Sequence, residues 1–107
     1  MRFLERRDPT APFFLKMSIH APHAPCAPPR YYFDKYMAMD IPEPKVADWA
    51  RVFDRPQRGL DVSSWRTALE PGVMKQYMAG YYGSIEHVDH QIGRVLNHLP
   101  ADTIVIF

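Results

Sequence analysis

The chain has 107 residues, and 13 lysines and arginines against 12 aspartates and glutamates give it a net charge of +1. This length allows at most one small domain. The near-zero charge, without a basic cluster, argues against nucleic acid or an anionic membrane as the main partner. Apolar runs are too short to span a bilayer. The single cysteine, Cys26, excludes an internal disulfide and any multi-cysteine metal site.

The first twenty residues predict the end of a helix followed by a strand. Residues 1–7 are typical of the last turns of a helix. The apolar run from Phe13 to Ile19 is typical of a strand covered on both faces, as in a parallel sheet.

Residues 21–72 read as a proline-rich loop on the substrate side, followed by an insertion. Six of the chain's 11 prolines lie within residues 22–44, which excludes a long helix or a central strand there. The accompanying aromatic residues predict an ordered loop with at most a short helix near Tyr31–Met37. A further weak helical pattern involves Val46, Trp49, Val52 and Phe53.

The clearest pattern, within residues 73–107, predicts a long helix and then a buried strand. Apolar residues recur at alternating spacings of three and four, which places them on one stripe of a helix from Val73 to Leu99. Gly80 and Gly83 inside it each cost about 1 kcal/mol relative to alanine, which indicates a close approach by a neighbouring element. The stripe consists of Met78, Tyr81, Ile85, Val88, Ile92, Val95 and Leu99.

The run from Thr103 to Phe107 predicts the second strand. A helix followed by a buried strand is half of a βαβ unit, so the fold class is α/β, with a mainly parallel sheet flanked by helices. The chain stops where open α/β sheets place their ligands, so we expect an internal fragment of a larger domain. Separated from its sheet, such a fragment is expected to aggregate or to remain loosely packed.

Histidines provide the candidate site residues. His20, His23 and Cys26 are spaced by three, but they are too few for a structural zinc site. A stiff loop at the end of a strand suits an imidazole that donates a proton or a hydrogen bond to an anionic oxygen, and loop packing is the alternative for both His23 and His20. His87 and His90 lie one turn apart, and their position off the apolar stripe predicts a solvated helix face. Cys26 is expected to be a small packed side chain.

Several segments, in this order, resemble the middle of a sulfatase. The resemblance extends to the phosphonate monoester hydrolases of the alkaline phosphatase superfamily, and residues 45–72 are its variable part. It implies a large α/β domain with a mixed, mainly parallel sheet between helices. The matching segments are Pro12–Leu15, Ser18–Pro25, Pro28–Asp34, Tyr36, Asp40–Pro44 and, above all, Tyr81–Leu96.

The resemblance also implies a chemistry. Such enzymes use a formylglycine, made from the cysteine or serine of a C/S-x-P/A-x-R motif, and a divalent cation, usually calcium. His23 matches the histidine that contacts the ester oxygen of the substrate and assists departure of the leaving group, whereas nothing carries over to His20. The family's nucleophile lies far upstream, so Cys26 is not expected to be the modified residue. The matched segments include no metal ligand.

We therefore expect the complete enzyme to hydrolyse sulfate esters of small molecules or glycans, and residues 1–107 alone to show no esterase activity and no tight metal binding. A phosphonate or phosphate diester hydrolase and a non-catalytic interaction module are the alternatives. Residues 45–72 are candidates for substrate preference or for contact with another subunit. The compartment, cytoplasmic or periplasmic, is left open.

Overall fold

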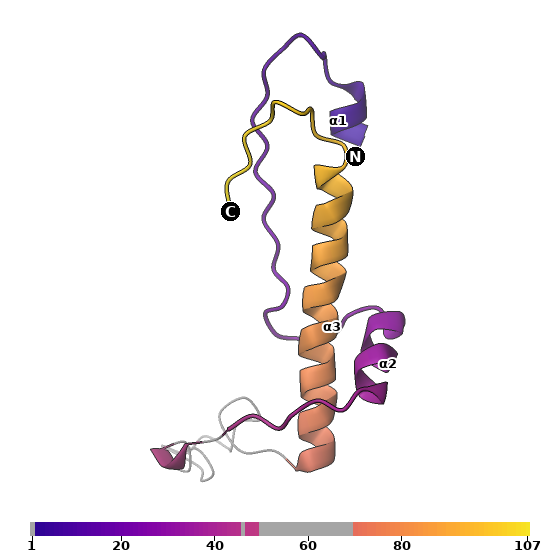
Figure 1. The fold of residues 1–107 in the computed structure, drawn as a ribbon, viewed down its shortest axis with the longest axis vertical. Coiled ribbons are helices and arrows are strands. Elements are labelled where there is room, and N and C mark those ends of the chain that lie inside the picture. The colour runs from indigo at the N-terminus through magenta and orange to yellow at the C-terminus, as the bar shows by residue number, and fades with distance from the viewer. Residues whose placement is uncertain (1, 46, 50–69) are drawn as a thin grey trace.

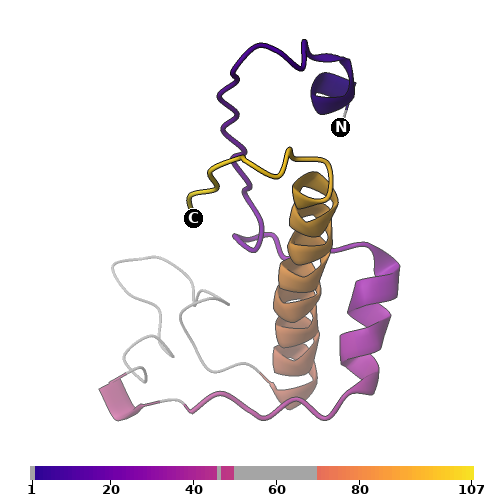
Figure 2. The ribbon, with the colours of Figure 1, turned by 45° about the horizontal axis from the view of Figure 1, so that its top comes forward.

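The computed structural model describes residues 2–45, 47–49 and 70–107, and three α-helices organise them. They are α1 (Arg2–Arg6), α2 (Arg30–Ala38) and α3 (Pro71–Leu96). α3 forms the long axis, and α2 lies beside its middle, with side-chain contacts from Tyr82 to His90 (Figure 1). The extended segment between α1 and α2 runs alongside α3 and then turns to reach α2 (Figure 2).

The predicted long helix is confirmed, with slightly different ends. Pro71 occupies the first turn of α3 instead of preceding it, because a proline there gives up an N–H that has no helical partner in any case. The helix ends at Leu96 and not at Leu99, since the chain then tightens into turns. The amide of His98 donates to the carbonyl of Val95, and the amide of Leu99 donates to the carbonyl of Leu96.

The predicted short helix is confirmed as α2, and the predicted helical residues at the start of the chain form α1. α2 follows two prolines, which suits a helix start. The weak helical pattern around Val52 lies outside the described residues apart from Trp49. No helix in the described part of the chain is long and apolar enough to cross a membrane.

The two predicted strands are wrong for the described chain. Phe13–Ile19 and Thr103–Phe107 run extended, but neither is part of a sheet. An extended segment becomes a strand only by exchanging backbone hydrogen bonds with a neighbour, and these two segments do not pair. The second segment is also exposed in the described chain, where the side chains of Ile104 and Ile106 are 87% and 89% exposed.

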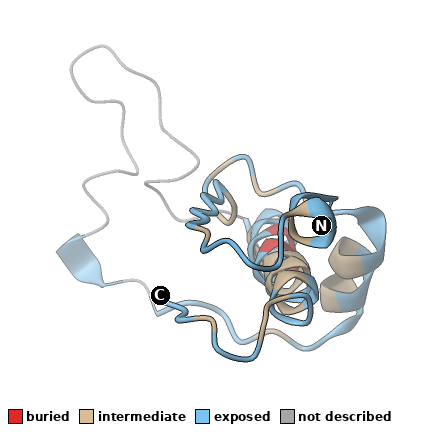
Figure 3. Cartoon of the chain, turned by 90° about the horizontal axis from the view of Figure 1, so that it is seen from above, coloured by how far each residue is buried: buried red, intermediate tan, exposed pale blue. Residues whose placement is uncertain are grey.

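The buried residues lie on a face of α3 made of small side chains. Within the described residues, Ala79, Gly80, Gly83 and Ser84 are buried (Figure 3). Ser84 donates its hydroxyl to the carbonyl of Gly80, which satisfies the buried oxygen. The predicted apolar stripe is more open, since Tyr81 and Ile85 are about 40% exposed. Small residues let the loop and α2 approach the backbone of α3 closely, and this packing determines which face is covered.

Candidate functional site

The proline-rich loop that carries the candidate histidines is built from tight turns. The amide of His23 donates to the carbonyl of His20 at 3.0 Å, and the amide of Ala27 donates to the carbonyl of Pro25 at 3.0 Å. The Ala21–Pro22 and Ala24–Pro25 peptide bonds are cis. Proline rings restrict the backbone between these turns, so the backbone that carries the two imidazoles has few alternative conformations.

Two glycines of α3 lie against this loop, which confirms the predicted close approach of a neighbouring element. A Cβ atom at Gly80 would collide with the backbone carbonyl oxygen of Cys26. A Cβ atom at Gly83, one turn further along α3, would lie 3.0 Å from Cγ of Pro28 and 3.2 Å from the carbonyl carbon of Tyr32. The end of the loop and the start of α2 therefore lie directly on the backbone of α3.

His23 is exposed and has one ring nitrogen engaged. Its Nδ1 lies 2.8 Å from the carbonyl oxygen of Ala24. A carbonyl only accepts hydrogen bonds, so Nδ1 carries the proton. Nε2 is then the nitrogen that can take up or release a proton, which is the property required of a general acid or base.

His20 lies next to His23. Their ring centroids are 4.6 Å apart, and the ring planes are tilted by 44°. His20 is also exposed. The structure thus brings together the two histidines that the sequence put forward as site candidates.

Cys26 is half-buried, in agreement with a packed side chain. Its Sγ–H donates to the carbonyl of Pro22 at 3.3 Å. Burial, together with the adjacent Cys26, raises the pKa of Tyr77 above its ordinary value. The residues from Cys26 to Arg30 read C-A-P-P-R and so satisfy the letters of the formylglycine motif. The packing of the thiol supports a structural role.

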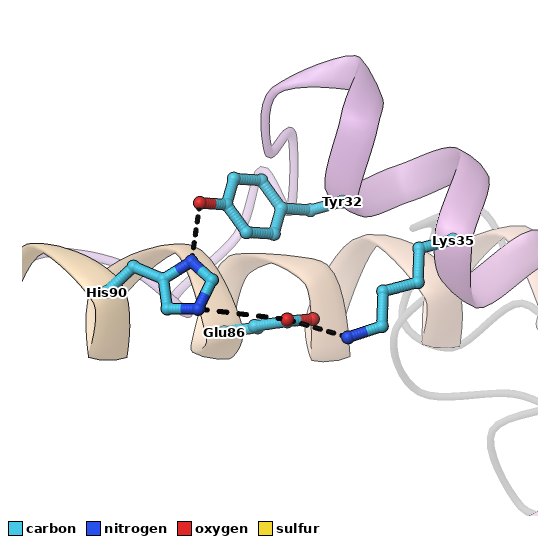
Figure 4. Close-up of polar contacts among 4 residues, drawn as sticks. All are labelled: Tyr32, Lys35, Glu86 and His90. Carbon is cyan, nitrogen blue, oxygen red and sulfur yellow. Dashed lines mark hydrogen bonds and ion pairs between the residues drawn. The ribbon is translucent and has the colours of Figure 1, made fainter.

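The second helix is joined to α3 by polar contacts that the sequence analysis missed (Figure 4). The Tyr32 hydroxyl lies 2.8 Å from Nδ1 of His90, and Nζ of Lys35 donates to Oε1 of Glu86 at 2.7 Å. The Lys35 hydrogen bond lowers the pKa of Glu86, and the same bond raises the pKa of Lys35. The i, i+3 spacing of the two α2 residues is the signal that placed them on one face.

These contacts correct part of the prediction of a solvated face on α3, because His90 is exposed as predicted whereas His87 is half-buried. The side chain of Glu86 is only 18% exposed, and the ring of Tyr32 packs 5.1 Å from that of His87. The small residues of α3 draw α2 close, so neighbouring polar side chains meet it instead of water. Neither Oε2 of Glu86 nor Nδ1 of His87, both buried, has a hydrogen-bond partner in the described structure.

A divalent cation has no evident place among these side chains. In residues 2–45, 47–49 and 70–107, no three histidine, cysteine, aspartate or glutamate side chains converge as a metal site requires. His87 and His90 are adjacent on α3, but they serve the contact with α2. The described residues thus do not fit the metal that the resemblance implies.

Comparison with known proteins decides the family, because the sulfatase family matches residues 1–107 in full. The chain belongs to the sulfatase family. It is 51% identical over 94 residues to an arylsulfatase of Clostridium perfringens, with 88% of the chain and 20% of that protein covered. It is 27% identical over 126 aligned positions to the iduronate 2-sulfatase of Mus musculus, which covers the whole chain and 23% of that protein.

A third relative has a broader name. The chain is 29% identical over 126 aligned positions to the multifunctional alkaline phosphatase superfamily protein PehA of Trinickia caryophylli, with all of the chain and 24% of that protein covered. The chain thus spans about a fifth to a quarter of these relatives. No solved structure matches it significantly. Sulfatase membership implies an alkaline phosphatase-like α/β fold, although the described residues contain helices and no strands.

Proposed function

We propose that the protein containing these residues hydrolyses sulfate esters, with His23 assisting departure of the leaving group. The match of the sulfatase family to the entire chain carries this proposal. The 51% identity to an arylsulfatase favours aryl sulfates as the first substrates to test. His23 lies in a segment that resembles the part of sulfatases that faces the substrate, and its exposure is consistent with that position.

The proposed role follows from which ring nitrogen of His23 carries a proton. Its Nδ1–H is held by the carbonyl of Ala24 at 2.8 Å, which leaves Nε2 for chemistry. As the bond between sulfur and the ester oxygen breaks, negative charge develops on that oxygen. A protonated Nε2 gives its proton to the oxygen and returns to the neutral form, and general acid catalysis of this kind contributes about 10²–10⁴-fold in rate.

We also propose that a formylglycine nucleophile and a divalent cation, calcium by resemblance, serve the complete enzyme. Cys26 is packed and hydrogen-bonded, and the described residues contain no cluster suited to a cation. Among the described residues, we therefore assign a role only in departure of the leaving group, and we assign that role to His23.

The test compares two substrates that differ in the leaving group. In the complete protein, His23→Ala is expected to lower kcat for phenyl sulfate by at least 10²-fold. The loss is expected to be smaller for 4-nitrophenyl sulfate, because nitrophenolate departs readily without a proton. His98→Ala is the matched control, because His98 is partly exposed and hydrogen-bonds the α3 carbonyl of Arg94. An equal loss on both substrates would contradict the proton-donor role.

A phosphonate or phosphate diester hydrolase is the second candidate. The similarity to PehA over the whole chain favours it. The ratio of kcat/KM for phenyl sulfate to that for a phenyl phosphonate monoester separates the candidates. We expect a ratio above one, and a ratio well below one would favour the phosphonate.

A further inference from the structure

The two imidazoles of the proline-rich loop lie side by side. The ring centroids of His20 and His23 are 4.6 Å apart, and a backbone hydrogen bond of 3.0 Å between these residues closes the turn that carries both. We propose that His20 is a second substrate-binding residue, which with His23 forms a two-point site for one tetrahedral oxyanion. This inference rests on the proposed function, in which His23 contacts the ester group.

The distances allow one anion to reach both rings. A ring nitrogen lies about 1.1 Å from the centroid of an imidazole, and a hydrogen-bonded oxygen lies about 2.8 Å beyond it. Each ring therefore reaches an oxygen about 4 Å from its centroid. The centroids are separated by 4.6 Å, less than twice that reach. This spacing allows one oxygen, or two oxygens of the same tetrahedral group, to contact both rings when the two exposed rings turn a nitrogen toward the same side.

Ring nitrogens of both histidines are available for hydrogen bonds to a ligand. Nδ1 of His23 is used by Ala24, whereas Nε2 is not. In the described parts of the chain, no hydrogen bond or ion pair involves the ring of His20. An anionic group that contacts both rings at their edges thus displaces no protein partner, and protonated rings donate to it. Bonds from a protonated imidazole to an anion are roughly twice as strong as those between neutral groups.

The charge pattern of the sequence that carries the pair suits an anion. The sequence contains no aspartate or glutamate between Asp8 and Asp34, whereas Lys16 and Arg30 fall within that interval. A protonated histidine in this loop therefore has no neighbouring carboxylate in sequence to neutralise it. The positive charge of a protonated histidine is therefore available to attract an anionic ligand. The chemistry recognised is that of a tetrahedral oxyanion, whether sulfate or phosphate.

The test measures anion binding and turnover separately in the complete protein. Calorimetry gives the Kd of inorganic sulfate and of inorganic phosphate, and kinetics give KM and kcat for phenyl sulfate. His20→Ala is expected to weaken sulfate binding and to raise KM, each by about tenfold, with kcat within twofold, because a charge-assisted contact is lost from substrate and transition state alike. His20→Asn retains an N–H donor and is expected to recover part of the affinity.

The outcomes distinguish this inference from the proposed function. An unchanged Kd and KM in His20→Ala, with His23→Ala impaired in kcat, would overturn the two-point site and leave the role of His23 intact. Equal loss of kcat in both His20 variants would indicate a folding role and would also overturn it. An unchanged kcat in His23→Ala on phenyl sulfate would contradict the role of His23 in the proposed function, and no turnover of any sulfate ester by the unmutated protein would contradict sulfate-ester hydrolysis itself. A Kd for phosphate well below that for sulfate, still raised by His20→Ala, would support the site with phosphate esters as its ligands.

Discussion

Gly80 is where the sequence of α3 bears most directly on the loop that carries the histidines. Its replacement by alanine would place a Cβ atom against the carbonyl oxygen of Cys26, a backbone atom that cannot swing away as a side chain can. Either the loop or the helix must move. Since His23 lies three residues before Cys26, we expect Gly80→Ala to displace the proposed proton donor.

The magnitude follows from two opposing effects. Replacing a helical glycine with alanine ordinarily stabilises a protein by about 0.4–1 kcal/mol, because the unfolded chain loses freedom. Gly72, also in α3, has nothing within 4 Å of its Cβ position, so Gly72→Ala should show this gain. Overpacking costs about 1–3 kcal/mol. The free energy of unfolding of Gly80→Ala should therefore lie about 1–3 kcal/mol below that of Gly72→Ala.

The assay combines denaturant unfolding with steady-state kinetics on the complete protein. A misplacement of about 1 Å at a catalytic group can cost 10²-fold in rate, so kcat for phenyl sulfate should fall in Gly80→Ala and not in Gly72→Ala. If Gly80→Ala were as stable and as active as Gly72→Ala, the loop would not depend on this contact. The account of how α3 positions His23 would then be wrong.

Two further predictions concern the contact between α2 and α3 and the thiol. The pKa of Glu86 lies below its ordinary value of 4.5, and the pKa of Lys35 lies above its ordinary value of 10.5. Their pairing therefore stabilises the fold between pH 4.5 and pH 10.5. This stabilisation is lost as the pH falls through the lowered pKa of Glu86 or rises through the raised pKa of Lys35. Glu86→Gln should weaken the acid dependence of stability in pH-dependent unfolding, and an unchanged acid limb would refute this. Cys26, with its proton held by Pro22, should remain a thiol in peptide mass spectrometry, and an aldehyde at this position would make it the nucleophile.

Local patterns in the sequence predicted the helices well. The alternation of threes and fours identified α3, and the proline-bounded aromatic run identified α2. Both depend on interactions within a few residues of one another, which a single sequence displays directly. The interior glycines even predicted the close approach at Gly80 and Gly83 before any neighbour was known.

Non-local features were harder to predict. A strand at Phe13–Ile19 requires a partner whose position no local pattern gives, and in the described chain none pairs with it. The face of α3 that carries Glu86 read as solvated because its residues are polar. The small residues beside that face let α2 pack closely on α3, so Lys35 of α2 hydrogen-bonds Glu86. Periodicity shows which side chains share a face but not what covers that face.

The position of His23 therefore depends on residues that have no chemistry of their own. Gly80 and Gly83, one turn apart on α3, receive Cys26 and then Pro28, so the end of the loop is held at two successive points. The ion pair between Lys35 and Glu86 holds the helix that follows. If His23 acts as proposed, a loop that is stiffened by prolines and held in this way needs little ordering when substrate binds, which lowers the entropy cost of binding. Variants at either glycine should thus change turnover more than their distance from the imidazole would indicate.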